Sequence, residues 1–123
     1  MNNTTNLVSA LALATATLAF MNPVFASAAK GSIDIMSPKN HAVLSSGSGD
    51  KLEYKVQLSP NGNHLHIYID KRRPLIDRQV SNCPCTIDLP KLSPGKHWIK
   101  VEEATKRHAL TGVKSTIVVR VKS

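Results

Sequence analysis

Apolar residues recur at every second position in short stretches from Ser32 onward, and Pro, Gly, Asn and Ser separate these stretches. The alternation is clearest in residues 51–58, whose inward positions would be Leu52, Tyr54, Val56 and Leu58. This pattern predicts β-strands with one face in a core and the other toward water. We expect strands to begin near residues 32, 51, 64, 75, 85, 97 and 113, with residues 75–80 as an edge strand and Thr105–Gly112 as a loop.

Seven short strands with closely spaced turn signals predict an all-β fold, an immunoglobulin-like antiparallel β-sandwich of two sheets. A small Greek-key barrel is the alternative that the same pattern permits. In the strand that begins at His64, alternation places Leu65, Ile67 and Ile69 inward and His64, His66 and Tyr68 outward. In the strand near residue 97, it places Ile99 and Val101 inward and Trp98, Lys100 and Glu102 outward.

The N-terminal segment has the features of an export signal. Residues 1–29 carry no charged side chain, and the apolar run from Leu7 to Met21 is short for a membrane span. Small residues favour cleavage after Ala26 or Ala28, so we expect a signal peptide over 1–28 and one domain over 29–123. An uncleaved anchor or an unstructured tail is the alternative. The mature protein is predicted to be periplasmic or secreted, with no transmembrane segment.

The formal net charge of +8 lies entirely on residues 30–123. Such a charge attracts anions, and an anionic envelope polymer or an envelope protein fits the predicted location. Nucleic acid is not an expected partner, because the chain has few aromatic rings to stack on bases. The candidate binding residues are Tyr68, Trp98, Lys100 and Arg120. The alternative is that the charge serves solubility alone.

Two histidines on one strand face suggest a second kind of site. His64 and His66 are two residues apart, so both imidazoles leave the same face of the strand. In the predicted sandwich, the strand near residue 97 runs antiparallel beside them and brings the loop residue His108 to the same end. A cluster of these histidines suits copper or zinc. Further candidate ligands are Cys83, Cys85 and Glu102. The alternative is that the histidines are ordinary surface residues.

Cys83 and Cys85 are the only cysteines in the chain, and only Pro84 separates them. In an oxidising compartment they could form a disulfide across Pro84, bind a metal, or stay free, buried or paired between chains. The sequence leaves these alternatives open.

Two motifs carry a resemblance to a known group of proteins. The run Asn63-His64-Leu65-His66-Ile67-Tyr68-Ile69-Asp70 is followed by Pro94-Gly95-Lys96-His97 before an apolar strand, and then by His108. This arrangement resembles small, uncharacterised, exported bacterial immunoglobulin-like domains. The resemblance implies an extracytoplasmic sandwich without an established activity. The chain departs from that pattern at Asn63, where Gly is usual, and at the Cys83-Pro84-Cys85 insertion.

The sequence gives little support for catalysis, because it has no Gly-x-Ser-x-Gly elbow, phosphate loop or His-Glu-x-x-His motif. We therefore expect no enzyme. The leading prediction is a periplasmic or secreted binding module of unknown ligand with a basic face. The alternatives are a copper or zinc binder or carrier that uses the histidines, and a structural domain that accompanies a larger envelope protein.

Overall fold

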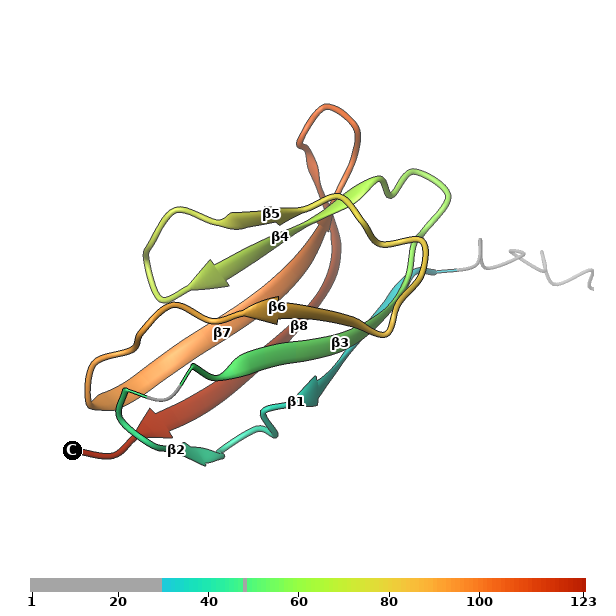
Figure 1. The fold of residues 1–123 in the computed structure, drawn as a ribbon. Coiled ribbons are helices and arrows are strands. Elements are labelled where there is room, and N and C mark those ends of the chain that lie inside the picture. Colours follow the sequence, from blue (N-terminus) through green and yellow to red (C-terminus); the bar gives the residue numbers. More distant parts are fainter. Residues whose placement is uncertain (1–29, 48) are drawn as a thin grey trace, which may run out of the picture.

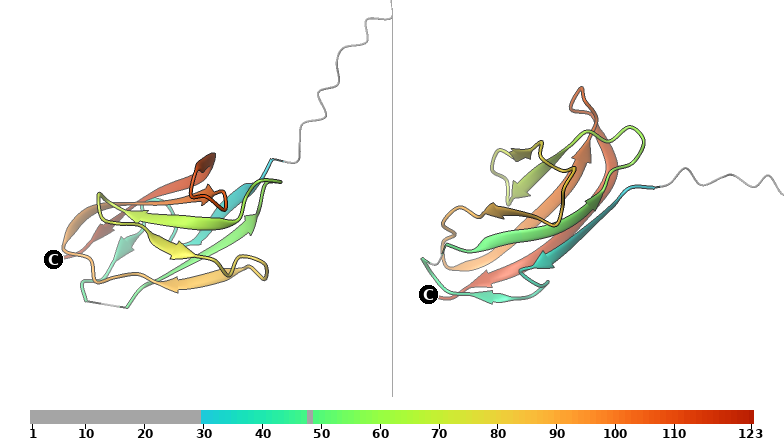
Figure 2. Two further views of the ribbon diagram at one scale, coloured as in Figure 1. Left: turned by 90° about the horizontal axis from the view of Figure 1, so that it is seen from above. Right: turned by 45° about the vertical axis from the view of Figure 1, so that its right-hand side comes forward.

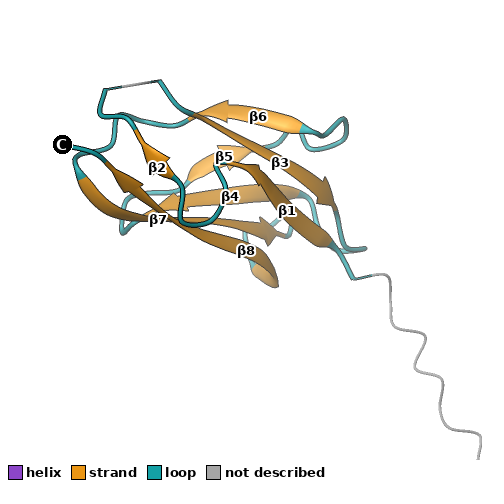
Figure 3. Cartoon of the chain, turned by 90° about the horizontal axis from the view of Figure 1, so that it is seen from below, coloured by secondary structure: helices purple, strands orange, loops and turns teal. Residues whose placement is uncertain are grey.

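A computed structural model describes residues 30–47 and 49–123 of the chain. The predicted signal peptide therefore lies outside the described residues. Within them, the chain forms strands joined by turns and loops (Figure 3). The strands are β1 (Ser32–Ser37), β2 (Val43–Leu44), β3 (Lys51–Gln57), β4 (His64–Ile69), β5 (Leu75–Asp77), β6 (Cys85–Asp88), β7 (Gly95–Ala104) and β8 (Leu110–Val121). No helix in the described part of the chain has the length and apolarity to cross a membrane.

The strands form two sheets that pack face to face, which confirms the predicted sandwich (Figures 1 and 2). One sheet has three strands in the order β1-β3-β6, and the other has five in the order β2-β8-β7-β4-β5. Every pairing is antiparallel except that of β2, which pairs parallel with the end of β8. The predicted pairing of β4 with β7 is also present.

The core lies between the sheets and consists of the inward side chains that the alternation predicts. Burying one such side chain contributes about 1.5–3 kcal/mol. Its best buried aliphatic and aromatic members are Leu52, Tyr54, Leu65, Ile67, Ile99, Val101 and Val119. Trp98, on the opposite face of β7, is 50% exposed as its outward position predicts.

The structure corrects two predicted element boundaries and adds one strand. The predicted loop Thr105–Gly112 is shorter, because β8 already begins at Leu110, which pairs with Ala104 across a tight hairpin. The edge strand near residue 75 ends at Asp77. The short strand β2 was not predicted, since two residues are too few for an alternating pattern.

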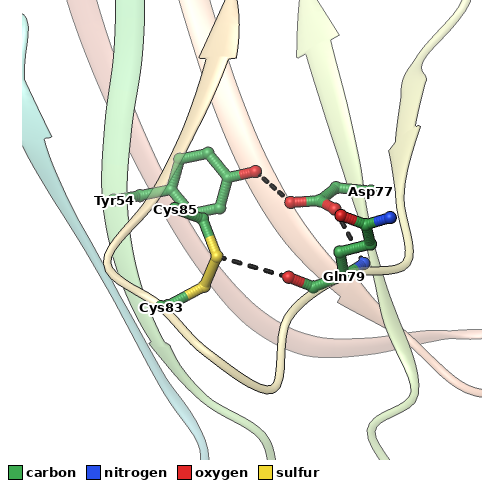
Figure 4. Close-up of a disulfide and its surroundings, with 5 residues drawn as sticks. All are labelled: Tyr54, Asp77, Gln79, Cys83 and Cys85. Carbon is green, nitrogen blue, oxygen red and sulfur yellow. Dashed lines mark hydrogen bonds between the residues drawn. A yellow bond between two sulfur atoms is a disulfide. The ribbon is translucent and has the colours of Figure 1, made fainter.

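A buried hydrogen bond links the two sheets near the β5 edge. Tyr54 of β3 is fully buried, and its hydroxyl donates to the carboxylate of Asp77 at the end of β5 (Figure 4). Burial and this bond to Asp77 raise the pKa of the Tyr54 phenol, so it stays protonated. The second oxygen of Asp77 accepts a bond from the Gln79 amide at 2.9 Å. Asp77 therefore fixes the start of the connection from β5 to β6.

At the opposite end, Asp70 and His97 form an ion pair. His97 Nδ1 lies 2.6 Å from Asp70 Oδ2, and its Nε2 lies 2.7 Å from the Ser93 carbonyl oxygen. Both ring nitrogens thus donate to acceptors, and the bond to Asp70 raises the pKa of His97. Burial opposes ionisation of Asp70, but the bonds from His97 and the Trp98 amide outweigh it and lower the pKa of Asp70.

We predict that Asp70→Asn lowers the free energy of unfolding by about 1–3 kcal/mol, the usual cost of losing a hydrogen bond to a charged group. Asn tolerates the positive φ of 53° at this position, so the backbone is retained. The stabilisation from His97 is complete below its ordinary pKa of about 6.5 and is lost as pH rises through its raised pKa. The stabilisation from Asp70 is complete above about 3.9 and is lost as pH falls through its lowered pKa. Urea unfolding should therefore show the largest difference between about pH 4 and 6.5. A difference that does not change from pH 4 to 9 would contradict the ion pair.

Candidate metal centre

Strand alternation and sheet pairing bring three histidines to one end of the five-stranded sheet. His64 and His66 leave the same face of β4, which runs antiparallel to β7 with His64 opposite Ala104. The chain turns back just beyond Ala104, so the tip of the β7–β8 hairpin lies beside the start of β4 (Figure 1). This tip carries His108, as the predicted topology requires. We call His64, His66 and His108 the histidine cluster.

The hairpin turn holds His108 in a defined conformation. Its backbone has a φ of 66°, a left-handed conformation that histidine adopts more readily than most residues. The His108 amide donates to the Thr105 carbonyl at 2.9 Å, and the Ala109 amide donates to Thr105 Oγ1 at 3.2 Å. These bonds fix the backbone of the turn, from which the His108 imidazole reaches His64 and His66 of β4.

One nitrogen of each histidine converges on a common point. His64 Nε2 lies 3.1 Å from His66 Nε2 and 3.1 Å from His108 Nδ1, and His66 Nε2 lies 3.2 Å from His108 Nδ1. A zinc ion about 2.0–2.1 Å from three nitrogens, with bond angles of about 100°, would hold them roughly 3.1 Å apart. The cluster therefore has the spacing of three ligands on one face of a metal ion.

Outer hydrogen bonds orient two of the three rings. His64 Nδ1 lies 3.0 Å from Asn63 Oδ1, and His66 Nδ1 lies 3.2 Å from the Tyr68 hydroxyl. A carbonyl oxygen only accepts, so the neutral His64 ring carries its proton on Nδ1, and the same assignment satisfies His66 with Tyr68 as acceptor. Both Nε2 atoms then present lone pairs to the centre. Partners of this kind fix the tautomer of metal-binding histidines.

The two β4 histidines of the cluster are more buried than the sequence predicts, whereas His108 is exposed. His64 and His66 do lie on the face opposite Leu65 and Ile67, but their exposures are 0% and 8%. Their rings pack against one another and against Tyr68 and His108, with ring centroids 4.6–6.0 Å apart. The predicted face is therefore correct for His64 and His66, but the prediction that this face is exposed is wrong. The alternation of residues within one strand does not show whether a turn from a distant part of the chain covers the outer face of that strand.

Burial and neighbouring positive charge keep these imidazoles neutral. Burial lowers the pKa of His64, and Arg78 and the other two histidines lower it further. Burial and His108 likewise lower the pKa of His66, while Glu102 opposes this effect. A neutral imidazole is the form that binds a metal, so two ligands are available at neutral pH.

The other candidate ligands lie outside the cluster. Only His64, His66 and His108 form a group of converging ligand atoms among the described residues. Glu102 is opposite His66 and buried, contrary to its predicted outward exposure, but its Oε2 pairs with Lys100 Nζ at 3.0 Å. Cys83 and Cys85 form a disulfide with each other, and Cys85 belongs to the three-stranded sheet. Neither sulfur is a thiolate ligand in this arrangement.

The predicted binding residues Tyr68, Trp98, Lys100 and Arg120 share the outer face of the five-stranded sheet. Lys100 Nζ lies 4.7 Å from the centre of the Tyr68 ring, and Lys96 Nζ lies 4.8 Å from that of Trp98. Arg120 is opposite Lys96 in the β7–β8 pairing. We call Tyr68, Lys96, Trp98, Lys100 and Arg120 the basic face. Its amines already contact aromatic rings.

Comparison with known proteins identifies the fold. No protein-family model matches the sequence, and no curated protein matches it. A solved structure of the fibronectin(III)-like modules of Clostridium thermocellum CbhA is similar to this chain, with a TM-score of 0.58 and 20% sequence identity. The match covers 73% of this chain and 96% of that one. The fold is fibronectin III-like. At this identity the likeness extends to the fold alone.

Two residues near the histidine cluster of this fibronectin III-like sandwich were not predicted from the sequence to belong to a site. In the sequence, Asn63 stands out only as a departure from a motif, although its position directly before the first histidine is a usable signal. Arg78 is one of many basic residues in the sequence, yet its Nη2 lies 3.5 Å from His108 Nε2. Nothing in the sequence links Arg78 to His108, because thirty residues separate them and only the tertiary structure brings them together.

We predict that His64 and His66 titrate below the ordinary histidine pKa of about 6.5, whereas His97 titrates above it. Imidazole proton signals followed by NMR from pH 4 to 9 would separate the two groups. Because the folded state resists protonation of His64 and His66, this pair should make the protein less stable as pH falls below about 6.5. Titration of all three residues near 6.5 would contradict the buried cluster.

Proposed function

We propose that the chain is an exported, non-enzymatic module that binds a copper or zinc ion through the histidine cluster. The observation that carries this proposal is the convergence of His64 Nε2, His66 Nε2 and His108 Nδ1 at 3.1–3.2 Å. Export rests on the predicted signal peptide, and binding without catalysis rests on the absence of known catalytic motifs from the sequence.

The donor set favours these metals. Imidazole nitrogens suit zinc and copper, whereas magnesium and calcium prefer oxygen ligands. Three protein ligands leave a fourth position for water or an external ligand, as in open zinc sites. Such an ion exchanges more readily than one closed in by four side chains, which supports a carrier or binding role.

The basic face supports a second candidate function, the binding of an anionic envelope polymer or an acidic envelope protein. Trp98 is half exposed between Lys96 and Lys100 on the outer face of β7, and no outer strand layer covers it among the described residues. Binding at this face would weaken with added salt and would not depend on the histidines. Metal binding would instead depend on the histidines and change little with added salt.

We predict that His108→Asn lowers zinc and copper(I) affinity at least about tenfold, because one of three ligands is lost. Asn retains the left-handed turn, so the fold should persist. The matched control is His41→Asn, because His41 also has a positive φ, of 67°, and lies outside the cluster. Calorimetric titration of the purified domain measures both variants. Equal affinities in His108→Asn and the unaltered protein would reject the metal site.

Asn63→Ala should weaken zinc binding about 10- to 100-fold, the usual effect of removing an outer hydrogen-bond partner of a ligand. The substitution leaves all three ligand nitrogens in place and removes only the acceptor for His64 Nδ1–H. Asn61→Ala, in the neighbouring turn, is the control. Competition with a zinc-binding dye gives the affinities, and circular dichroism checks the fold. Unchanged affinity would show that Asn63 does not orient a ligand.

A further inference from the structure

Arg78 lies beside the histidine cluster. Asp77 accepts bonds from the Tyr54 hydroxyl and the Gln79 amide, and the Gln79 carbonyl oxygen lies 3.5 Å from Cys85 Sγ (Figure 4). Asp77 is thus hydrogen-bonded to Tyr54 of the three-stranded sheet, whereas the Gln79 carbonyl oxygen only contacts the disulfide sulfur. The exposed Arg78 therefore directly follows a residue that is anchored to that sheet.

The guanidinium of Arg78 lies beside His108, and its charge also acts on His64 and His66. Its Nη2 is 3.5 Å from His108 Nε2, and its charge contributes to the lowered pKa of both His64 and His66. No ion pair joins Arg78 to a carboxylate within residues 30–47 and 49–123. The nearby carboxylate of Glu102 pairs with Lys100. Because Arg78 is exposed, a divalent ion on the three neutral imidazoles would add two positive charges beside a third that is balanced by solvent and not by an ion pair.

Hydrogen bonding makes Arg78 respond to the ion. Arginine only donates, so His108 Nε2 accepts from it when the His108 proton is on Nδ1, where it can bond to the other two histidines. A metal ion on Nδ1 requires that proton to move to Nε2. Two N–H donors would then face each other, and the guanidinium would need a different acceptor.

We propose that the histidine cluster binds its metal ion together with a small carboxylate, one oxygen of which takes the open metal position while the other accepts bonds from Arg78. This inference rests on the metal-binding function proposed above. A planar carboxylate matches the paired donors of a guanidinium and supplies the missing negative charge. By linkage, the carboxylate must strengthen metal binding by the same factor by which the metal strengthens carboxylate binding.

The test uses the zinc-loaded mature domain in a buffer without carboxylate or phosphate. Acetate is titrated by calorimetry into the unaltered protein, into Arg78→Gln and into the control Arg73→Gln, which alters an exposed arginine in the β4–β5 turn. Arg78→Gln should bind acetate at least about tenfold more weakly, while Arg73→Gln should bind it normally. Without acetate, Arg78→Gln should bind zinc more tightly than the unaltered protein, and acetate should remove that advantage.

The outcomes separate the two proposals. A protein that does not load with zinc overturns both. A protein that loads with zinc, but whose acetate affinity is the same in Arg78→Gln and Arg73→Gln, overturns only the carboxylate pairing. Tighter, Arg78-dependent binding of phosphate than of acetate overturns the assignment to a carboxylate. A blocked aspartate amide that binds more tightly than acetate supports a protein carboxylate as the source, and equal binding supports a free acid.

Discussion

The register between β4 and β7 determines where every side chain of the site lies. His66 is opposite Glu102 and His64 is opposite Ala104, the last residue before the hairpin that carries His108. A shift of one residue would turn Leu65 and Ile67 out of the core and both histidines into it. The core therefore enforces the register, because burial of those two apolar side chains stabilises one alignment only. The chemistry of the outer face follows from the packing of the inner face.

His64 and His66 can be buried at low cost because their imidazoles are neutral. A buried charged imidazole would be costly, and the lowered pKa values of His64 and His66 express that cost. Asn63 and Tyr68 satisfy the outer ring nitrogens, so the inner nitrogens are left to share a proton or a metal ion. Glu102, opposite His66, offsets part of the positive charge around that ring, but it is also paired with Lys100. A ligand that brings its own negative charge would therefore suit the proposed metal site.

Much of this arrangement could be predicted from the sequence. Alternation placed His64 and His66 on one face, and the expected antiparallel neighbour brought His108 to the same end, because both inferences need only local periodicity and a common topology. The burial of that face, the pairing of Glu102 with Lys100 and the position of Arg78 depend on contacts between distant segments, which periodicity does not encode. The disulfide between Cys83 and Cys85 was one of several alternatives that spacing alone left open.

The cluster combines two histidines on a strand inside the sheet with one histidine on a turn. β4 is hydrogen-bonded to β5 on one side and to β7 on the other, whereas His108 projects from a hairpin tip held mainly by bonds within the turn. Hairpin tips open locally at a lower free energy than the strands inside a sheet. An ion shared by β4 and the hairpin tip would therefore raise the free energy of opening the tip more than the free energy of unfolding the whole domain. Release of the ion would need only the tip to open, so such a site can exchange its metal without unfolding the sandwich.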